Sequence, residues 1–118
     1  MLVPQAYYTD GSGWNGEKSE YVVTDETGHI ITRRTLPEER TNNEMEYDGV
    51  IYALQLAKDG DTIYSDSQLV VNQLTKNWKV KARNLISRYN YAKELFSNKN
   101  VKLLWIRREK NLAGKIFE

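Results

Sequence analysis

The chain has 118 residues, 40% of them hydrophobic and 28% charged, with a formal net charge of +1 and no cysteine. This size and composition predict one globular domain over residues 1–118 rather than a disordered chain. Without cysteine there is no disulfide framework or thiolate zinc site, and neither a secretion signal nor an apolar run of about 18 residues is visible. We therefore expect a cytoplasmic monomer that makes no contact with a membrane.

The first predicted elements are three strands. Residues 5–9 form a short aromatic run that ends at Asp10 and is typical of a strand. Residues 21–23 and 30–32 are rich in β-branched side chains, and residues 25–28, Asp-Glu-Thr-Gly, are a hairpin signal between them. We expect the three strands to form an antiparallel meander.

A helix is predicted next, because apolar residues repeat at helical spacing after Glu46. This spacing places Glu46 on the edge of the face that packs on the sheet. The elements that follow are, in chain order, a strand at 62–65, helices at 67–74 and 84–96, a strand at 101–106 and a short helix from about Leu112. The pattern by itself predicts a mixed α/β domain.

Three acidic residues lie where one kind of chemistry would use them together. Asp10 follows the first predicted strand, Glu46 lies at the start of the first predicted helix, and Asp66 follows the fourth predicted strand. Carboxylates brought close together repel one another unless a cation neutralises them, and hard cations such as Mg²⁺ prefer oxygen ligands. The three residues therefore predict a divalent metal site suited to phosphodiester hydrolysis.

Each of these positions also has a purely structural interpretation. Asp10 can be a turn residue, because Asp accepts backbone hydrogen bonds, and Glu46 can be an acid that the helix dipole favours in a first turn. Asp66 can cap the next helix, and Thr41 or Asn42 can cap the first one. The sequence leaves these structural roles open beside the metal-binding role.

Four motifs resemble type 1 ribonucleases H, including the branch of archaeal enzymes and reverse-transcriptase domains. The motifs are, in chain order, Asp10-Gly11-Ser12, Thr41-Asn42-Asn43 before Glu46, Ser65-Asp66-Ser67-Gln68, and Trp105-Ile106-Arg107-Arg108-Glu109-Lys110-Asn111. The resemblance runs nearly end to end. It implies an α/β ribonuclease H-like fold, with a five-stranded mixed sheet flanked by helices. Strands one to three would be antiparallel, and strands one, four and five would be parallel.

The resemblance also implies an activity, which is endonucleolytic cleavage of the RNA strand of RNA/DNA hybrids by two-metal hydrolysis. Two Mg²⁺ ions, for which Mn²⁺ would substitute, act in such sites, and the products carry 5′-phosphate and 3′-hydroxyl ends. Asp10 would be shared by both ions, Asp66 would hold the ion on the nucleophile side, and Glu46 would hold the ion on the leaving-group side.

Further positions match those with which the family contacts its substrate. The RNA strand and its 2′-hydroxyl groups would meet Gly11, Ser12, Asn42, Asn43 and Gln68, and the DNA strand would meet Asn72 and Trp78. Basic residues cluster in residues 76–83 and again near the C-terminal end, and phosphate contacts are expected from Lys79, Lys81 and Arg108. The alternative for these basic clusters is an ordinary solvated surface.

The chain departs from the bacterial pattern in two ways. The segment 77–84 is too short for a basic helical protrusion, and the acid that usually follows Asn111 is missing. The fourth metal ligand is then either Asn111, through its amide oxygen, or Glu118, whereas Asn111 can instead be a helix cap. The missing acid leaves open a nucleic-acid-binding domain with weakened catalysis. Another nuclease of the same fold, such as a junction resolvase, also stays open because such enzymes share this arrangement of carboxylates.

Overall fold

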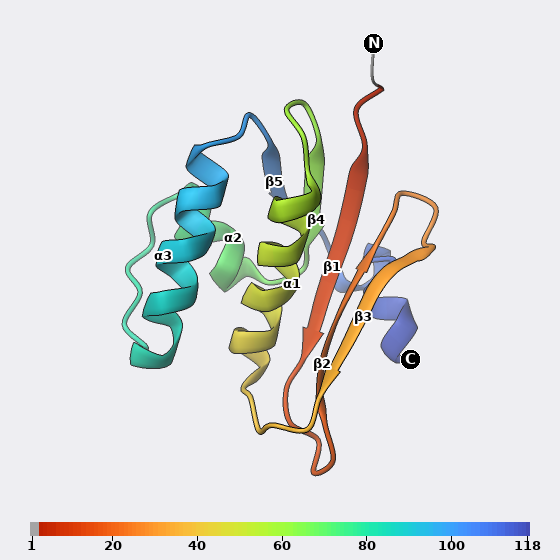
Figure 1. Cartoon of the computed structure of the whole chain (residues 1–118), viewed down its shortest axis with the longest axis vertical. Helices are drawn as coiled ribbons and strands as arrows, with labels where there is room; N and C mark the ends of the chain where they lie inside the picture. Colours follow the sequence, from red (N-terminus) through yellow and green to blue (C-terminus); the bar gives the residue numbers. More distant parts are fainter. Residues whose placement is uncertain (1–2) are drawn as a thin grey trace.

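The computed structural model describes residues 3–118 and contains one five-stranded mixed sheet. Met1 and Leu2, the first residues of the predicted domain, lie outside the described residues. The strands are β1 (Ala6–Ser12), β2 (Ser19–Thr24), β3 (Ile30–Leu36), β4 (Thr62–Ser65) and β5 (Lys102–Trp105). They lie side by side in the order β3-β2-β1-β4-β5 (Figure 1).

The strand directions agree with the predicted sheet. β1 is antiparallel to β2, β2 is antiparallel to β3, and β4 runs parallel to both β1 and β5. The predicted hairpin turn is also confirmed, since the Gly28 N–H donates to the Asp25 carbonyl at 3.1 Å and Gly28 has a φ of 89°. A positive φ costs glycine little because it has no Cβ, so this residue suits the turn.

Three α-helices cover one face of the sheet: α1 (Asn42–Leu56), α2 (Gln68–Thr75) and α3 (Arg83–Ser97). Figure 1 shows α1 in front of the central strands, with the C-terminal segment behind the sheet. The predicted helix from about Leu112 is present only as a 3-10 turn at Gly114–Phe117. Another 3-10 turn, at Arg108–Lys110, comes before it. No helix among residues 3–118 is both long and apolar enough to span a bilayer.

The hydrophobic core lies between the sheet and the helices. Alternate residues of β2, Tyr21 and Val23, face α1, and Ile63 of β4 is fully buried beneath the helices. On α1 the buried residues recur at helical spacing, and the largest of them, Tyr47, donates its hydroxyl hydrogen to the buried Gln73 amide oxygen of α2. This packing fixes α1 against the strands whose ends carry Asp10 and Asp66.

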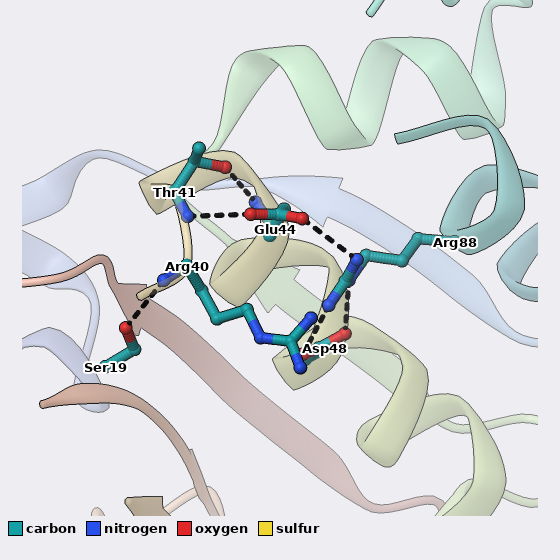
Figure 2. Close-up of polar contacts among 6 residues, drawn as sticks. All are labelled: Ser19, Arg40, Thr41, Glu44, Asp48 and Arg88. Carbon is teal, nitrogen blue, oxygen red and sulfur yellow. Dashed lines mark hydrogen bonds and ion pairs between the residues drawn. The ribbon is translucent and has the colours of Figure 1, made fainter. Parts of the chain in front are cut away.

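The N-terminus of α1 is held by a network of polar contacts (Figure 2). Thr41 is the N-cap, with a capping box in which the Glu44 N–H donates to Thr41 and the Thr41 N–H donates to Glu44. Arg88 of α3 reaches across to the same helix, pairing with Glu44 at 3.2 Å and with Asp48 at 2.8 Å. The cap therefore belongs to Thr41, not Asn42, and α3 helps to fix the turn from which Glu46 projects.

Candidate functional site

Three carboxylates converge at one end of the sheet. Asp10 lies in β1, Glu46 in the second turn of α1, and Asp66 directly after β4. One oxygen from each lies within 4.8 Å of the oxygens from the other two. The residues that the sequence singled out as a group are therefore brought together by the fold.

The parallel pairing of β1 and β4 explains how two of these carboxylates meet. The register places Tyr8 beside Tyr64 and Thr9 beside Ser65. Asp10 and Asp66 are the next residues on the two neighbouring strands, so they leave the same edge of the sheet. Functional groups commonly gather at the carboxyl ends of parallel strands for this reason.

Gly11 connects the third carboxylate, that of Glu46, to the carboxylate of Asp10. Its N–H donates to Oε1 of Glu46 at 2.6 Å and to Oδ1 of Asp10 at 2.9 Å. A Cβ at this position would lie 2.3 Å from the Met45 carbonyl carbon and 2.4 Å from the Glu46 nitrogen. Only glycine permits β1 to approach α1 this closely, and this approach lets Glu46 reach the strand.

The electrostatics of the cluster are those of acids crowded in a buried place. Burial raises the pKa of Glu46, and the charges of Asp10 and Asp66 raise it further. Burial and the charge of Asp66 also raise the pKa of Asp10, although hydrogen bonding with Glu46, the Gly11 N–H and the charge of Arg108 lower it. A set of three oxygen donors that repel one another fits a hard divalent cation, which would relieve that repulsion.

A cavity of about 330 Å³ lies beside Asp10. Several residues with a predicted role in substrate binding line it, and these are Gly11, Ser12, Asn42 and Arg108. The side-chain oxygen of Asn42 accepts the Gly13 N–H at 2.5 Å, so the Asn42 amide NH₂ is the end that stays available as a donor. Glu118, a predicted candidate for the fourth ligand, lines the same cavity together with Gly114 and with Phe117, a residue that the sequence did not single out.

The remaining predicted contacts do not line the cavity. Asn43 and Gln68 are exposed in the first turns of α1 and α2. Trp78 is 49% exposed, and its backbone N–H donates to the Asn72 carbonyl at 3.3 Å, so these two residues are neighbours. The loop between α2 and α3 also carries the exposed side chains of Lys79 and Lys81.

Asn111 is fully buried beside the carboxylates. Its amide nitrogen donates to Oδ2 of Asp66 at 3.1 Å and to the Thr9 carbonyl at 2.9 Å. Its amide oxygen accepts the Ala113 N–H at 3.1 Å, just before the last 3-10 turn. The amide nitrogen therefore faces the acidic cluster, and the amide oxygen caps the turn that follows.

Trp105 contacts the site in a way that the sequence did not predict. The indole N–H donates to the Asp66 carbonyl at 3.1 Å, although the side chain is 44% exposed. The two residues are far apart in the chain and meet because β4 and β5 are neighbours. No local sequence signal predicts such a contact, because the contact depends on which strands pair.

Comparison with known proteins gives consistent results. A family model described as RNase H matches residues 4–114 of the chain. Among curated proteins, the bifunctional protein Rv2228c of Mycobacterium tuberculosis (strain ATCC 25618 / H37Rv) is 36% identical over 76 residues, which cover 60% of this chain and 21% of that protein. The chain therefore spans about a fifth of the length of the curated relatives it matches.

Solved structures extend the similarity over nearly the whole chain. The N-terminal RNase H domain of Rv2228c has a TM-score of 0.74 and 28% identity, and covers 93% of this chain and 86% of that one. RNase H1 of Halobacterium salinarum NRC-1 has a TM-score of 0.72 and 26% identity, covering 97% and 93%. LC11-RNase H1, crystallised with an RNA/DNA hybrid, has a TM-score of 0.67 and 28% identity, covering 91% and 88%. These matches confirm the fold expected from the sequence motifs.

Proposed function

Because the chain belongs to the RNase H family, we propose that it is a metal-dependent endonuclease that cleaves the RNA strand of RNA/DNA hybrids. The observation that carries this proposal is the convergence of Asp10, Glu46 and Asp66, whose oxygens lie within 4.8 Å of one another. The similarity to LC11-RNase H1, a protein crystallised with such a hybrid, supports the choice of substrate.

The three carboxylates would hold two Mg²⁺ ions, for which Mn²⁺ would substitute. When bound, these ions supply Lewis-acid stabilisation of the attacked phosphate and of the 3′ oxygen that leaves, giving 5′-phosphate and 3′-hydroxyl products. Asp10 lies on the central strand and is suited to serve both ions. Asp66 would serve the side of the attacking water, and Glu46 the side of the leaving group. The protein contributes mainly by holding these oxygens in place, through Gly11 and the fixed start of α1.

Specificity for a hybrid requires recognition of the RNA 2′-hydroxyl in a shallow minor groove, without reading the bases. The cavity beside Asp10 offers suitable groups, since the Asn42 amide keeps its NH₂ free to donate and Ser12 supplies a hydroxyl. Asn43 and Gln68, exposed at the starts of their helices, would extend this contact. We assign Asn72 and Trp78 to the DNA strand, where the indole can pack against a sugar.

The proposal is tested by incubating the purified protein with an RNA/DNA hybrid whose RNA is labelled at its 5′ end. We expect cleavage of the RNA strand that requires Mg²⁺ or Mn²⁺ and stops when the cation is chelated. Single-stranded RNA and duplex DNA should stay largely intact under the same conditions. Equal cleavage of duplex DNA would favour a resolvase-like nuclease instead. Binding of the hybrid without cleavage of any substrate would favour a domain with weakened catalysis, since the acid expected after Asn111 is missing.

Reversing the charge of Lys79 or Lys81 should raise KM for the hybrid with little effect on kcat. Both lysines are exposed in the loop between α2 and α3, away from the carboxylates, where phosphate contacts would add affinity only. The dependence of log KM on log salt concentration should become shallower by about 1 for each contact removed. The measurement is steady-state kinetics at several salt concentrations.

Lys58 provides the matched control for this experiment. It is exposed just before β4, at the opposite end of the sheet from the carboxylates. Lys58→Glu makes the same change in net charge and should leave KM nearly unchanged. If Lys79→Glu and Lys81→Glu behave like Lys58→Glu at every salt concentration, the loop is only solvated surface.

A further inference from the structure

Asn111 makes the one side-chain hydrogen bond to the Asp66 carboxylate found among residues 3–118. The Asn111 side chain has three partners: Oδ2 of Asp66 at 3.1 Å, the Thr9 carbonyl at 2.9 Å and the Ala113 N–H at 3.1 Å. Thr9 is the residue before Asp10 and is itself fully buried. A single amide group therefore joins the Asp66 carboxylate to the strand that carries Asp10.

The orientation of this amide is determined by its partners. In the observed orientation both hydrogens of the NH₂ group meet oxygen acceptors, and the amide oxygen meets a backbone donor. Rotating the amide by half a turn would place its oxygen against two other oxygens and its NH₂ against the Ala113 N–H. In the rotated orientation these buried polar groups would have no hydrogen-bond partner. That would lower the stability of the folded protein, because the Asn111 side chain is fully buried. The amide nitrogen, not the amide oxygen, therefore faces Asp66.

We propose that Asn111 is a positioning residue that holds the Asp66 carboxylate at a set distance from Asp10. This inference rests on the proposed function, because it concerns the same carboxylates. It favours a role for Asn111 through its hydrogen bonds over the role of fourth ligand that the sequence suggested. One oxygen of Asp66 accepts the Asn111 hydrogen bond, and the other stays free to face a cation.

A second contact holds the main chain of the same residue. The Trp105 indole N–H donates to the Asp66 carbonyl at 3.1 Å, and the Ile106 N–H donates to the Ser65 carbonyl at 2.9 Å. Trp105 at the end of β5 thus holds the backbone of Asp66, and Asn111 in the segment after β5 holds its carboxylate. Hydrogen bonds to the ligands of a metal typically change its affinity by about 10- to 100-fold when they are removed.

The test compares Mn²⁺ binding by calorimetry in the wild type and in Asn111→Ala, Asn111→Asp and Gln73→Ala. Asn111→Asp keeps an acceptor for the Ala113 N–H but removes the donors to both Asp66 and the Thr9 carbonyl. Gln73 is the matched control, because it is also a buried amide but bonds to Tyr47, away from the carboxylates. We expect both Asn111 variants to bind Mn²⁺ about 10- to 100-fold more weakly than the wild type, and Gln73→Ala to bind it normally.

Hybrid kinetics give a second measurement. Because Asn111 acts on a carboxylate and not on the nucleic acid, its variants should lower kcat while KM for the hybrid changes little. If the wild type binds Mn²⁺ but cleaves no hybrid, the proposed function fails, and the positioning role is judged on Mn²⁺ affinity alone. If Asn111→Asp binds Mn²⁺ as tightly as the wild type or more tightly, Asn111 is a ligand position and the inference is overturned.

Nuclear magnetic resonance of the ¹⁵N-labelled protein covers the case in which an Asn111 variant does not fold. Asp66→Asn preserves the shape of the side chain and should fold. Its amide would replace the carboxylate partner of Asn111, so the Asn111 side-chain NH₂ resonance should shift while that of Gln73 should not. An unchanged Asn111 resonance would show that the contact is absent and would overturn the inference.

Discussion

Replacing Asp10 with asparagine is expected to abolish metal-dependent cleavage of an RNA/DNA hybrid while the protein stays folded. The change removes the charge of the central carboxylate but keeps its shape, and Oδ1 of asparagine can still accept the Gly11 N–H. Metal ions contribute several kcal/mol of transition-state stabilisation, so the rate should fall by at least about a thousandfold. Asp66→Asn should act in the same direction. The measurement is single-turnover cleavage at saturating Mg²⁺.

The same variant should be more stable than the wild type when divalent cations are absent. Burial and the charge of Asp66 raise the pKa of Asp10, which means that its ionised form is disfavoured in the folded protein. An acid whose pKa is raised in the folded state contributes stability that is fully present below its pKa in the unfolded state. This contribution is lost as the pH rises through its pKa in the folded state. At neutral pH the wild type has lost this contribution to stability. Asp10→Asn has not, because asparagine carries no charge. Thermal unfolding in chelator should therefore show a higher Tm for the variant.

Addition of Mg²⁺ should narrow or reverse this difference, because the cation stabilises only a protein that binds it. Asp59→Asn is the matched control, since Asp59 is exposed in the loop before β4 and lies outside the acidic cluster. It should change neither cleavage nor the effect of Mg²⁺ on Tm. A cleavage rate near that of the wild type in Asp10→Asn would refute the mechanism.

Gly11→Ala is expected to have the second large effect, on both folding and activity. The added Cβ would lie 2.3 Å from the Met45 carbonyl carbon, 2.4 Å from the Glu46 nitrogen and 2.6 Å from the Met45 oxygen. These are backbone atoms of α1 that cannot rotate away, so β1 and α1 must separate. Overpacking of this kind costs about 1–3 kcal/mol or more. The separation would also move Glu46 from the other carboxylates, so cleavage should fall even where the protein stays folded.

Gly49→Ala is the matched control, because Gly49 also lies at the contact between α1 and β1. A Cβ there would meet its nearest atoms at 3.5 Å, which is ordinary van der Waals contact. Alanine also favours a helix interior over glycine by about 1 kcal/mol, so this variant should be as stable as the wild type or more stable. Denaturant unfolding measures both variants. Equal stability of Gly11→Ala and Gly49→Ala would mean that β1 and α1 are not in close contact at Gly11.

Much of the fold followed from local signals in the sequence. The strand at Thr62–Ser65 has the predicted bounds, and the Asp25 to Gly28 turn is where its composition placed it. Alternation and helical spacing identify such elements because burial on one side of a strand or helix repeats with a fixed period. The carboxylates were found for a similar reason, since each was predicted to follow a strand or to start a helix, although Asp10 lies within β1 itself. The prediction of a helix from about Leu112 was wrong, because the residues after Asn111 form only a 3-10 turn.

Only the tertiary structure decided how Asn111, Trp105 and Arg88 contribute to the site. Arg88 reaches α1 from α3, Trp105 reaches Asp66 from the neighbouring strand, and the Asn111 amide reaches Thr9 across nearly the whole chain. The residue type of Asn111 allows a ligand, a cap or a hydrogen-bond donor equally well. Which of these it becomes depends on the groups that surround it, and those come from strands whose pairing no local pattern encodes. The sequence by itself thus identified the acids, whereas the packing of distant segments determined what holds them in place.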